Sequence, residues 1–431
     1  VRPPACSVAP DVTPTGLTAV PPSFRRMIRS NLRLLGLFLA LALVAAGCGD
    51  TDSSDVALAG SPPTTAAADT TETESSTTTT APPATTAAPD AALPDGPSPA
   101  EPGEFAVGRR SITLIDSDRD DRTFSVDVWY PADGEAAEAA PKAVYSFIPG
   151  VEFTSEVAAA DVPVAEGGPY PFVIYSHGSG GQRFQASDNA ELLASHGFVV
   201  AAPDHVGNTA FDELLDTRAP DEQIEIDRPT DTAFTITELL EQSAAPDTPL
   251  SGALDPDRIG IYGHSFGGYT ALTAVSGRGD VPPDDRIVAA VGHAAATERS
   301  TDAELEAVDV PTLLLSGTKD ETTPIADNTE RPWELISGRP LVRVDIVDGG
   351  HQSFSDVCDY QELAPTFADA PEALVDFIDD FARDGCAPGL IDIDRAHEII
   401  DTYTVAFLQR YVAGDAEAEA YLTPEYAETI P

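Results

Sequence analysis

Short apolar runs alternate with amphipathic, helix-like segments along the chain from about residue 104. The central runs are apolar throughout, which is typical of parallel strands buried on both faces of a sheet. Segments with helical periodicity, such as 186–196 and 230–242, lie between them. The alternation predicts an α/β fold with a mostly parallel, eight-stranded sheet flanked by helices. The expected strands are 111–115, 123–130, 172–176, 198–202, 258–262, 287–292, 312–316 and 341–347.

The connections between these runs narrow the architecture further. A polar turn at 116–121 joins the first two runs, as in an antiparallel hairpin at a sheet edge. No connection between 292 and 312 is long enough to form a large cap domain over the sheet. The tail at 391–411 has the periodicity of one or two amphipathic helices, which we expect to pack against the body of the domain.

The first fifty residues carry the features of an export signal. Met27 begins a basic stretch, an apolar run follows at 34–46, and Cys48 comes directly after small residues. The run is too short to span a bilayer, so we interpret it as a signal peptide. The small residues before Cys48 resemble a bacterial lipobox, in which this cysteine becomes the lipidated first residue of a cell-envelope lipoprotein on the outer face of the membrane. An ordinary signal peptide cleaved near Ala46, with Cys48 as a free thiol, is the alternative.

We therefore divide the chain into three parts. Residues 1–47 comprise sequence upstream of the translation start and the signal peptide, and residues 48–103 form a Thr-, Ala- and Pro-rich stalk. Such a stalk buries too little apolar surface to offset its ordering entropy, so we expect it to be disordered. Residues 104–431 form the globular domain with its helical tail.

The chain is strongly acidic, with 72 Asp and Glu against 24 Lys and Arg and a formal net charge of −48. This charge argues against nucleic acid as a partner and favours solubility. The sequence contains no spacing typical of a metal site and no phosphate-binding glycine loop, so we expect no metal and no cofactor. In an exported domain we expect Cys358 and Cys386 to form a disulfide, and two buried free thiols are the alternative.

A Gly-x-Ser-x-Gly motif places Ser265 between the expected strand at 258–262 and a helix at 269–275. Gly263 and Gly267 suit a sharp strand-to-helix turn, in which the backbone comes too close for side chains. Such a turn exposes the serine hydroxyl at the carboxyl end of the sheet. The sequence therefore predicts Ser265 as a nucleophile.

A serine nucleophile requires a base, and the base requires an orienting carboxylate. His351 follows the last expected strand, where the chain order of such enzymes places the base. Asp320 follows a buried strand and is the preferred carboxylate, with Glu321 and Asp327 as nearby alternatives. His264 is expected to serve only in packing around the site.

An oxyanion formed during acyl transfer requires hydrogen-bond donors that are already in place. The N–H of Phe266, the residue after the nucleophile, is expected to be one donor. The loop after the third expected strand supplies the other from Ser179, where Gly178 and Gly180 let the backbone approach the substrate. His177 is expected to brace this loop.

Six short segments identify a family resemblance. They are WYP at 129–131, SHGSGG at 176–181, LASHGFVVAA at 193–202, RIG at 258–260, GHSFGG at 263–268 and GGH at 349–351. Together they resemble the platelet-activating factor acetylhydrolases, a family of α/β-hydrolases, over roughly residues 104–386. GHSFGG is shared with bacterial cutinases and dienelactone-hydrolase-like enzymes. The resemblance implies a calcium-independent serine esterase that removes short acyl groups from phospholipids, with oxyanion donors at Ser179 and Phe266.

The chain departs from this family at the position of the acid. Animal members carry the acid after the sixth strand, where this chain has Gly292-His293-Ala294 and no carboxylate. Here the acid has to follow the seventh strand, at Asp320, as in bacterial cutinases. Phospholipids, small esters and polyesters therefore stay open as substrates. The leading hypothesis is a lipid-anchored, acetylhydrolase-like serine esterase. The alternatives are a cutinase-like or general carboxylesterase and a non-catalytic surface binding protein on the same fold.

Overall fold

The computed structural model describes residues 98–367 and 370–430. The predicted signal peptide, Cys48 and most of the predicted stalk lie outside the described residues. The described part corresponds to the predicted globular domain. None of its helices combines the length and the apolar character required to cross a membrane.

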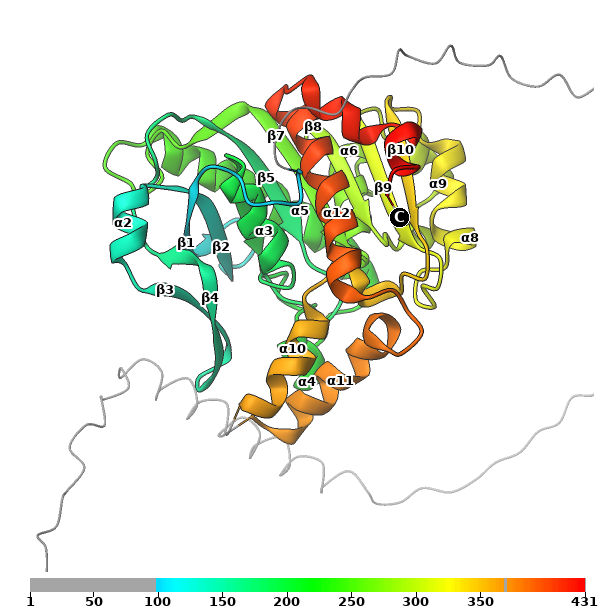
Figure 1. The fold of residues 1–431 in the computed structure, drawn as a ribbon, viewed down its shortest axis with the longest axis horizontal. Helices are drawn as coiled ribbons and strands as arrows, with labels where there is room; N and C mark the ends of the chain where they lie inside the picture. Colours follow the sequence, from blue (N-terminus) through cyan, green and yellow to red (C-terminus); the bar gives the residue numbers. More distant parts are fainter. Residues whose placement is uncertain (1–97, 368–369, 431) are drawn as a thin grey trace, which may run out of the picture. The chain divides into compact units, whose positions relative to one another are not determined.

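A single sheet, with ten strands among the described residues, forms the centre of the domain (Figure 1). Its spatial order is β10-β9-β8-β7-β5-β6-β2-β1-β4-β3. Neighbouring strands from β10 to β6 are parallel, and β2 lies antiparallel to β6. The strands are β1 (Ala106–Asp116), β2 (Arg122–Ala132), β3 (Lys142–Ile148), β4 (Val151–Ala160), β5 (Tyr170–Ser176), β6 (Val199–Pro203), β7 (Leu254–His264), β8 (Ile287–His293), β9 (Thr312–Gly317) and β10 (Leu341–Ile346).

All eight predicted strands are present, and β3 and β4 are two further strands at one edge of the sheet. These two strands pair antiparallel with each other, and β4 pairs with β1. Along β3, exposed positions alternate with buried ones, and most buried positions of β4 are separated by exposed polar residues. The edge strands therefore lack the continuous apolar runs that mark the central strands, which is why the predicted number was too low.

Helices are present in all four segments where the sequence analysis expected them, with somewhat different bounds. They are α3 (Ser187–Ser195), α5 (Asp221–Ala244), α6 (Phe266–Ser276) and α12 (Ile393–Leu408), and α11 (Glu372–Cys386) is a further long helix. The other helices of the described chain are α2 (Gly134–Ala139), α4 (Ala210–Leu214), α7 (Asp302–Glu306), α8 (Ile325–Asn328), α9 (Glu330–Leu335), α10 (Val357–Leu363) and α13 (Pro424–Ala427), and the short 3-10 helices include η2 (His351–Phe354).

The central strands are buried on both faces, so the sheet separates two apolar cores. Val173 and Tyr175 of β5 belong to one core, and Phe172 and Ile174 of the same strand belong to the other. Helices α3 and α12 cover the first core, and α5 and α6 cover the second (Figure 1). The alternation along β5 follows from the two-residue period of a strand. The predicted packing of the tail is confirmed by α12.

No large cap covers the sheet within the described residues. The connection from β8 to β9 contains only a short 3-10 turn and α7. Helices α10 and α11 follow β10 and lie beside α4 (Figure 1). The mostly parallel sheet flanked by helices, without a large cap, confirms the predicted fold class.

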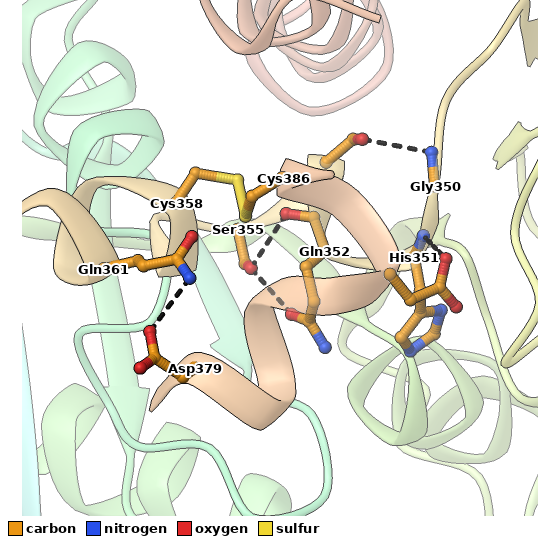
Figure 2. The surroundings of a disulfide bond; sticks show 10 residues. Gly350, His351, Gln352, Ser355, Cys358, Gln361, Asp379 and Cys386 are labelled. Atoms are coloured by element: carbon orange, nitrogen blue, oxygen red, sulfur yellow. Dashed lines mark hydrogen bonds between the residues drawn. A yellow bond between two sulfur atoms is a disulfide. The ribbon is translucent and has the colours of Figure 1, made fainter. Parts of the chain in front are cut away.

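The predicted disulfide is present. The sulfurs of Cys358 and Cys386 are 2.04 Å apart, and the bond joins α10 to the last residue of α11. Figure 2 shows this bond close to Gln352 and Ser355, which follow β10 in the chain. The disulfide therefore holds α11 against the segment that carries His351.

We expect the double variant Cys358→Ser, Cys386→Ser to lose about 3 kcal/mol of unfolding free energy, because the bond closes a 28-residue separation in the unfolded chain. Urea unfolding of the domain measures this loss. Reduced wild-type protein should match the double variant. Equal stability of oxidised wild type and the double variant would contradict the prediction.

Candidate active site

Ser265 occupies a strained turn between β7 and α6. Its backbone has φ 57° and ψ −118°, a conformation that costs free energy in a residue with a side chain. A Cβ on Gly267 would lie 1.8 Å from the Ser176 carbonyl oxygen, and one on Gly263 would lie 2.3 Å from the Gly267 carbonyl oxygen. Only glycine fits at both positions, as the motif predicts.

The structure brings Ser265, His351 and Asp320 together in one hydrogen-bonded chain. His351 Nε2 lies 2.8 Å from Ser265 Oγ, and His351 Nδ1 lies 2.9 Å from Asp320 Oδ2. The three residues follow β7, β10 and β9, whose carboxyl ends meet at one edge of the sheet. His351 and Asp320 are buried, at 2% and 6% exposure, whereas Ser265 is half-buried.

Asp320 is held as a carboxylate by its neighbours. Its Oδ1 accepts the N–H groups of Thr322 and Thr323 at 2.9 and 2.6 Å, and its Oδ2 accepts the Thr323 hydroxyl at 2.7 Å. Burial alone raises the pKa of Asp320, but the hydrogen bonds from His351 and Thr323 outweigh it and leave the pKa below its usual value. The alternatives Glu321 and Asp327 are exposed. Asp320 is therefore the carboxylate that contacts His351.

His264 packs beneath the site, as expected. Its Nε2 donates to the His351 carbonyl oxygen at 2.9 Å, and the two rings are 4.7 Å apart. Burial and the neighbouring His351 hold the pKa of His264 well below its usual value. A neutral His264 thus supports the backbone of His351.

The predicted oxyanion loop follows β5 and is braced by His177. Its Nε2 accepts the His205 N–H at 3.0 Å, which leaves the ring proton on Nδ1 to donate to the Gly178 carbonyl oxygen at 2.7 Å. Burial, followed by the charge of Arg228, holds the pKa of His177 well below its usual value. The Gly178 N–H donates to the Gln185 side chain at 2.7 Å. The His177 ring thus connects the backbones of Gly178 and His205.

The two predicted oxyanion donors are free to bind a ligand. Neither the N–H of Ser179 nor that of Phe266 donates a hydrogen bond to another group of the described chain. Phe266 is the first residue of α6, where the helix dipole is positive. The contact of Gly267 with the Ser176 and His177 carbonyls places the two donor segments side by side.

A buried arginine that the sequence analysis missed supports this loop from below. Arg228, in α5, is completely buried. Its guanidinium donates to the His177 carbonyl oxygen, to Asn208 Oδ1 at 2.6 Å and to Ser176 Oγ at 3.1 Å. Asn208 Nδ2 in turn donates to Ser179 Oγ at 2.8 Å. Arg228 thus contacts the start of the oxyanion loop at Ser176 and His177 and reaches Ser179 through Asn208.

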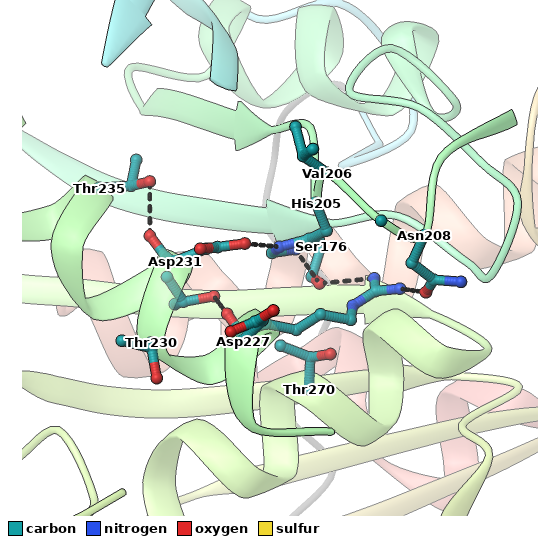
Figure 3. A network of polar contacts seen from close by, with 12 residues as sticks. Ser176, His205, Val206, Asn208, Asp227, Thr230, Asp231, Thr235 and Thr270 are labelled. Carbon is teal, nitrogen blue, oxygen red and sulfur yellow. Dashed lines mark hydrogen bonds and ion pairs between the residues drawn. The ribbon is translucent and has the colours of Figure 1, made fainter. Parts of the chain in front are cut away.

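The same polar network includes a second serine–histidine–aspartate contact, formed by Ser176, His205 and Asp231 (Figure 3). His205 lies 3.0 Å from Ser176 Oγ through Nε2 and 3.2 Å from Asp231 Oδ2 through Nδ1. Ser176, His205 and Asp231 are all completely buried, so they brace the loop and have no access to a substrate.

Arg228 also lies close to Phe266, the other predicted oxyanion donor. The guanidinium lies 4.9 Å from the centre of the Phe266 ring. Burial lowers the pKa of Arg228 to about 9, against the opposing effect of Asp231, so the side chain is a cation at neutral pH. The sequence analysis missed Arg228 because no motif or periodicity distinguishes a single arginine in an acid-rich helix. Its contacts are with residues that lie 20 to 52 positions away in the chain.

A small apolar cavity of about 40 Å³ adjoins the oxyanion loop. It lies between that loop and helices α10 and α11, and its lining includes Phe147, Gly180, Ala210, Val357, Phe377 and Phe381. The side chains of Phe377 and Phe381 pack against Gly180. The cavity is large enough for a group of only a few heavy atoms.

One group of carboxylates in the described chain has ligand spacing for a cation. One carboxylate oxygen from each of Asp188, Asp356 and Asp359 lies within 4.8 Å of the others. Burial raises the pKa of all three, with further contributions from neighbouring acids. None of them forms a hydrogen bond with the Ser265–His351–Asp320 chain. Three neighbouring carboxylates are not sufficient to assign a metal site here.

The architecture is that of an α/β-hydrolase. A solved ferulic acid esterase from Streptomyces cinnamoneus matches it with a TM-score of 0.56, over 72% of this chain and 91% of that chain. The sequence identity is 24%, so this likeness shows the fold alone.

In sequence, the chain is similar to the platelet-activating factor acetylhydrolases, as predicted. The family model for platelet-activating factor acetylhydrolase, isoform II, matches residues 151–243, which include the oxyanion loop and Arg228. The dog enzyme is 28% identical over 156 residues, which are 26% of this chain and 34% of the dog protein. The guinea pig enzyme is 29% identical over 147 residues, with shares of 26% and 34%. The matched region thus spans about a third of the length of these relatives.

We expect Arg228→Met to lower the unfolding free energy by about 3 kcal/mol, because the His177 carbonyl and Asn208 lose a buried donor. Urea unfolding measures the change. Arg286→Met is the matched control, since Arg286 pairs with Asp284 near the surface and should change stability by less than about 1 kcal/mol. Equal losses in the two variants would contradict a bracing role for Arg228.

Proposed function

We propose that the protein is an exported, lipid-anchored serine esterase that hydrolyses carboxylic esters with short acyl groups. The observation that carries the proposal is the hydrogen-bonded chain Ser265–His351–Asp320, next to the unoccupied N–H groups of Ser179 and Phe266. A nucleophile, its base, the orienting acid and the oxyanion donors are the parts that acyl transfer requires. A surface protein that only binds a ligand has no use for all four.

The first half of the reaction forms an acyl-enzyme. His351 Nε2 takes the hydroxyl proton of Ser265 as Oγ attacks the ester carbonyl, and Asp320 stabilises the imidazolium that results. The carbonyl oxygen becomes an oxyanion and accepts hydrogen bonds from Ser179 and Phe266. The carbon–oxygen bond to the alcohol then breaks, and His351 gives its proton to the departing alcohol oxygen.

The second half releases the acid. Water attacks the acyl carbon while His351 takes one of its protons, and the same oxyanion donors stabilise the second tetrahedral intermediate. The bond to Ser265 Oγ breaks, and His351 returns the proton to that oxygen. The products are a carboxylic acid and an alcohol, and the chemistry requires no metal or cofactor.

The small apolar cavity beside Gly180, in the loop that carries Ser179, supports a short acyl group in this proposal. The names of the sequence relatives point to an acetyl ester of a phospholipid as the substrate class. A cutinase-like or general carboxylesterase is the second candidate. It is favoured by the position of Asp320 after β9, because the resemblance to bacterial cutinases places the acid there.

Export and lipidation are supported by the sequence around Cys48 and by the disulfide. Disulfides persist in oxidising compartments outside the cytosol. A lipid-modified Cys48 followed by a long polar stalk would hold the catalytic domain at the outer face of the membrane.

We expect Ser265→Ala to abolish fluorophosphonate labelling and to lower kcat for p-nitrophenyl acetate by roughly 10⁴- to 10⁶-fold, since the nucleophile is lost. Ser276→Ala, at the far end of α6, is the matched control and should label like wild type. Across p-nitrophenyl esters from acetyl to long acyl chains, kcat/KM should fall as the chain lengthens. Rising values would favour the cutinase-like alternative, and a folded wild type that neither labels nor hydrolyses would exclude an esterase.

We expect the full chain, expressed in a bacterial host, to partition into the detergent phase, and the variant Cys48→Ser to partition into the aqueous phase. The physical reason is the loss of the acyl chains from the first residue of the mature protein. Ser53→Ala, in the stalk that stays on the mature protein, is the control and should behave like wild type. A detergent-phase Cys48→Ser variant would contradict anchoring at this cysteine.

A further inference from the structure

The carboxylate of Asp384 contacts both loops that carry the base and the acid. Its Oδ1 accepts the His351 N–H at 3.1 Å. Its Oδ2 accepts the N–H and the hydroxyl of Thr322, at 2.9 and 2.7 Å, and the N–H of Glu321 at 3.1 Å. Thr322 and Glu321 directly follow Asp320. One side chain from a third element therefore joins the two loops.

The position of Asp384 is set by a break in the helical conformation at the end of α11. Asp384 and Gly385 leave the helical conformation. Gly385 packs on Gln352, the residue after His351, so closely that a Cβ at 385 would lie 2.6 Å from Gln352 Cβ. The next residue, Cys386, is tied to Cys358 by the disulfide. Figure 2 shows this disulfide beside Gln352, with a carboxylate bonded to the His351 N–H.

The two loops also contact each other directly. The Lys319 N–H donates to the Gly349 carbonyl oxygen at 2.9 Å, and the Thr323 hydroxyl lies 3.1 Å from His351 Nδ1. The ladder between β9 and β10, however, ends at Gly317 and Ile346, before either loop reaches its functional residue. Beyond that point, Asp384 adds four hydrogen bonds that fix where the base and the acid lie relative to each other.

We infer that Asp384 is a positioning residue of the esterase, acting through the backbone of His351 and the loop of Asp320. The inference rests on the proposed function. Asp384 touches no reacting atom, and it lies outside the region matched by the family model. Its removal allows the imidazole and the carboxylate to drift apart, and small displacements of reacting groups reduce rates strongly.

A positioning role differs from a purely structural role in what it changes. A purely structural residue alters the fraction of folded protein, while each folded molecule keeps its normal rate. A positioning residue lowers the rate of every folded molecule, because the base no longer aligns with Ser265. The rate of fluorophosphonate labelling per folded site separates these two cases.

The test uses the full chain with its disulfide intact and the variants Asp384→Ala and Asp384→Asn. Asp379→Asn is the matched control, because Asp379 is an exposed acid of the same helix whose side chain pairs with Gln361 at 2.9 Å (Figure 2). The measurements are kcat and KM for p-nitrophenyl acetate and the labelling rate constant. All are taken well below the lowest unfolding temperature in the series.

We expect Asp384→Ala to lower kcat and the labelling rate in parallel, by about ten- to a hundred-fold, with KM little changed and labelling still complete at long times. Asp384→Asn should lose less, since its amide oxygen can still accept from one of the two loops. Asp379→Asn should match wild type. The Asn variant preserves the size of the side chain, so it carries the test where the Ala variant does not fold.

Wild-type labelling rates in folded Asp384 variants would overturn the inference. A loss of activity equal to the fraction of protein that never labels would also overturn it. In that case each folded molecule keeps its normal rate, which is the mark of a purely structural role. A folded wild type that neither labels nor hydrolyses would overturn the proposed esterase itself, and the inference with it. The wild-type and variant results thus separate the two failures.

Discussion

The site depends on one close contact between backbone segments. The turn that carries Ser265 lies so near the end of β5 that a Cβ on Gly267 would collide with the Ser176 carbonyl at 1.8 Å. This contact places the nucleophile beside the oxyanion loop that follows β5. It also explains the positive φ of Ser265, which the packed sheet and α6 hold in place. The strain at one residue is thus the consequence of bringing two strand ends together.

That contact leaves polar backbone groups buried, and the chain satisfies them with side chains from α5. The guanidinium of Arg228 binds the His177 carbonyl, and Asp231 binds His205 beneath the loop. A buried cation without partners would be costly, and these acceptors and the charge of Asp231 offset part of the desolvation, although burial still lowers the pKa of Arg228 to about 9. These buried contacts hold the backbone of the loop after β5 in place, which is the preorganisation that the proposed oxyanion donors require.

The sequence sufficed to predict the features that arise locally. The central strands were predicted because burial on both faces makes them apolar throughout, and Ser265 because its turn requires glycines at fixed spacing. The edge strands β3 and β4 were missed because one of their faces is exposed. Arg228 and Asp384 were missed because each acts on residues 51 and 33 positions away, respectively, and no local pattern encodes such contacts.

The two halves of the site are built differently. One half, formed by Ser265 and the loop after β5, belongs to the core, since β5, β7 and α5 position it through buried backbone contacts and a buried arginine. The other half, formed by His351 and Asp320, lies on loops beyond the ends of β9 and β10, where the ladder no longer holds it. A disulfide-tied helix outside the sheet fixes that second half through Asp384. Under the proposed function, changes at Asp384 are therefore expected to act on the rate, and changes at Arg228 on the stability of the core.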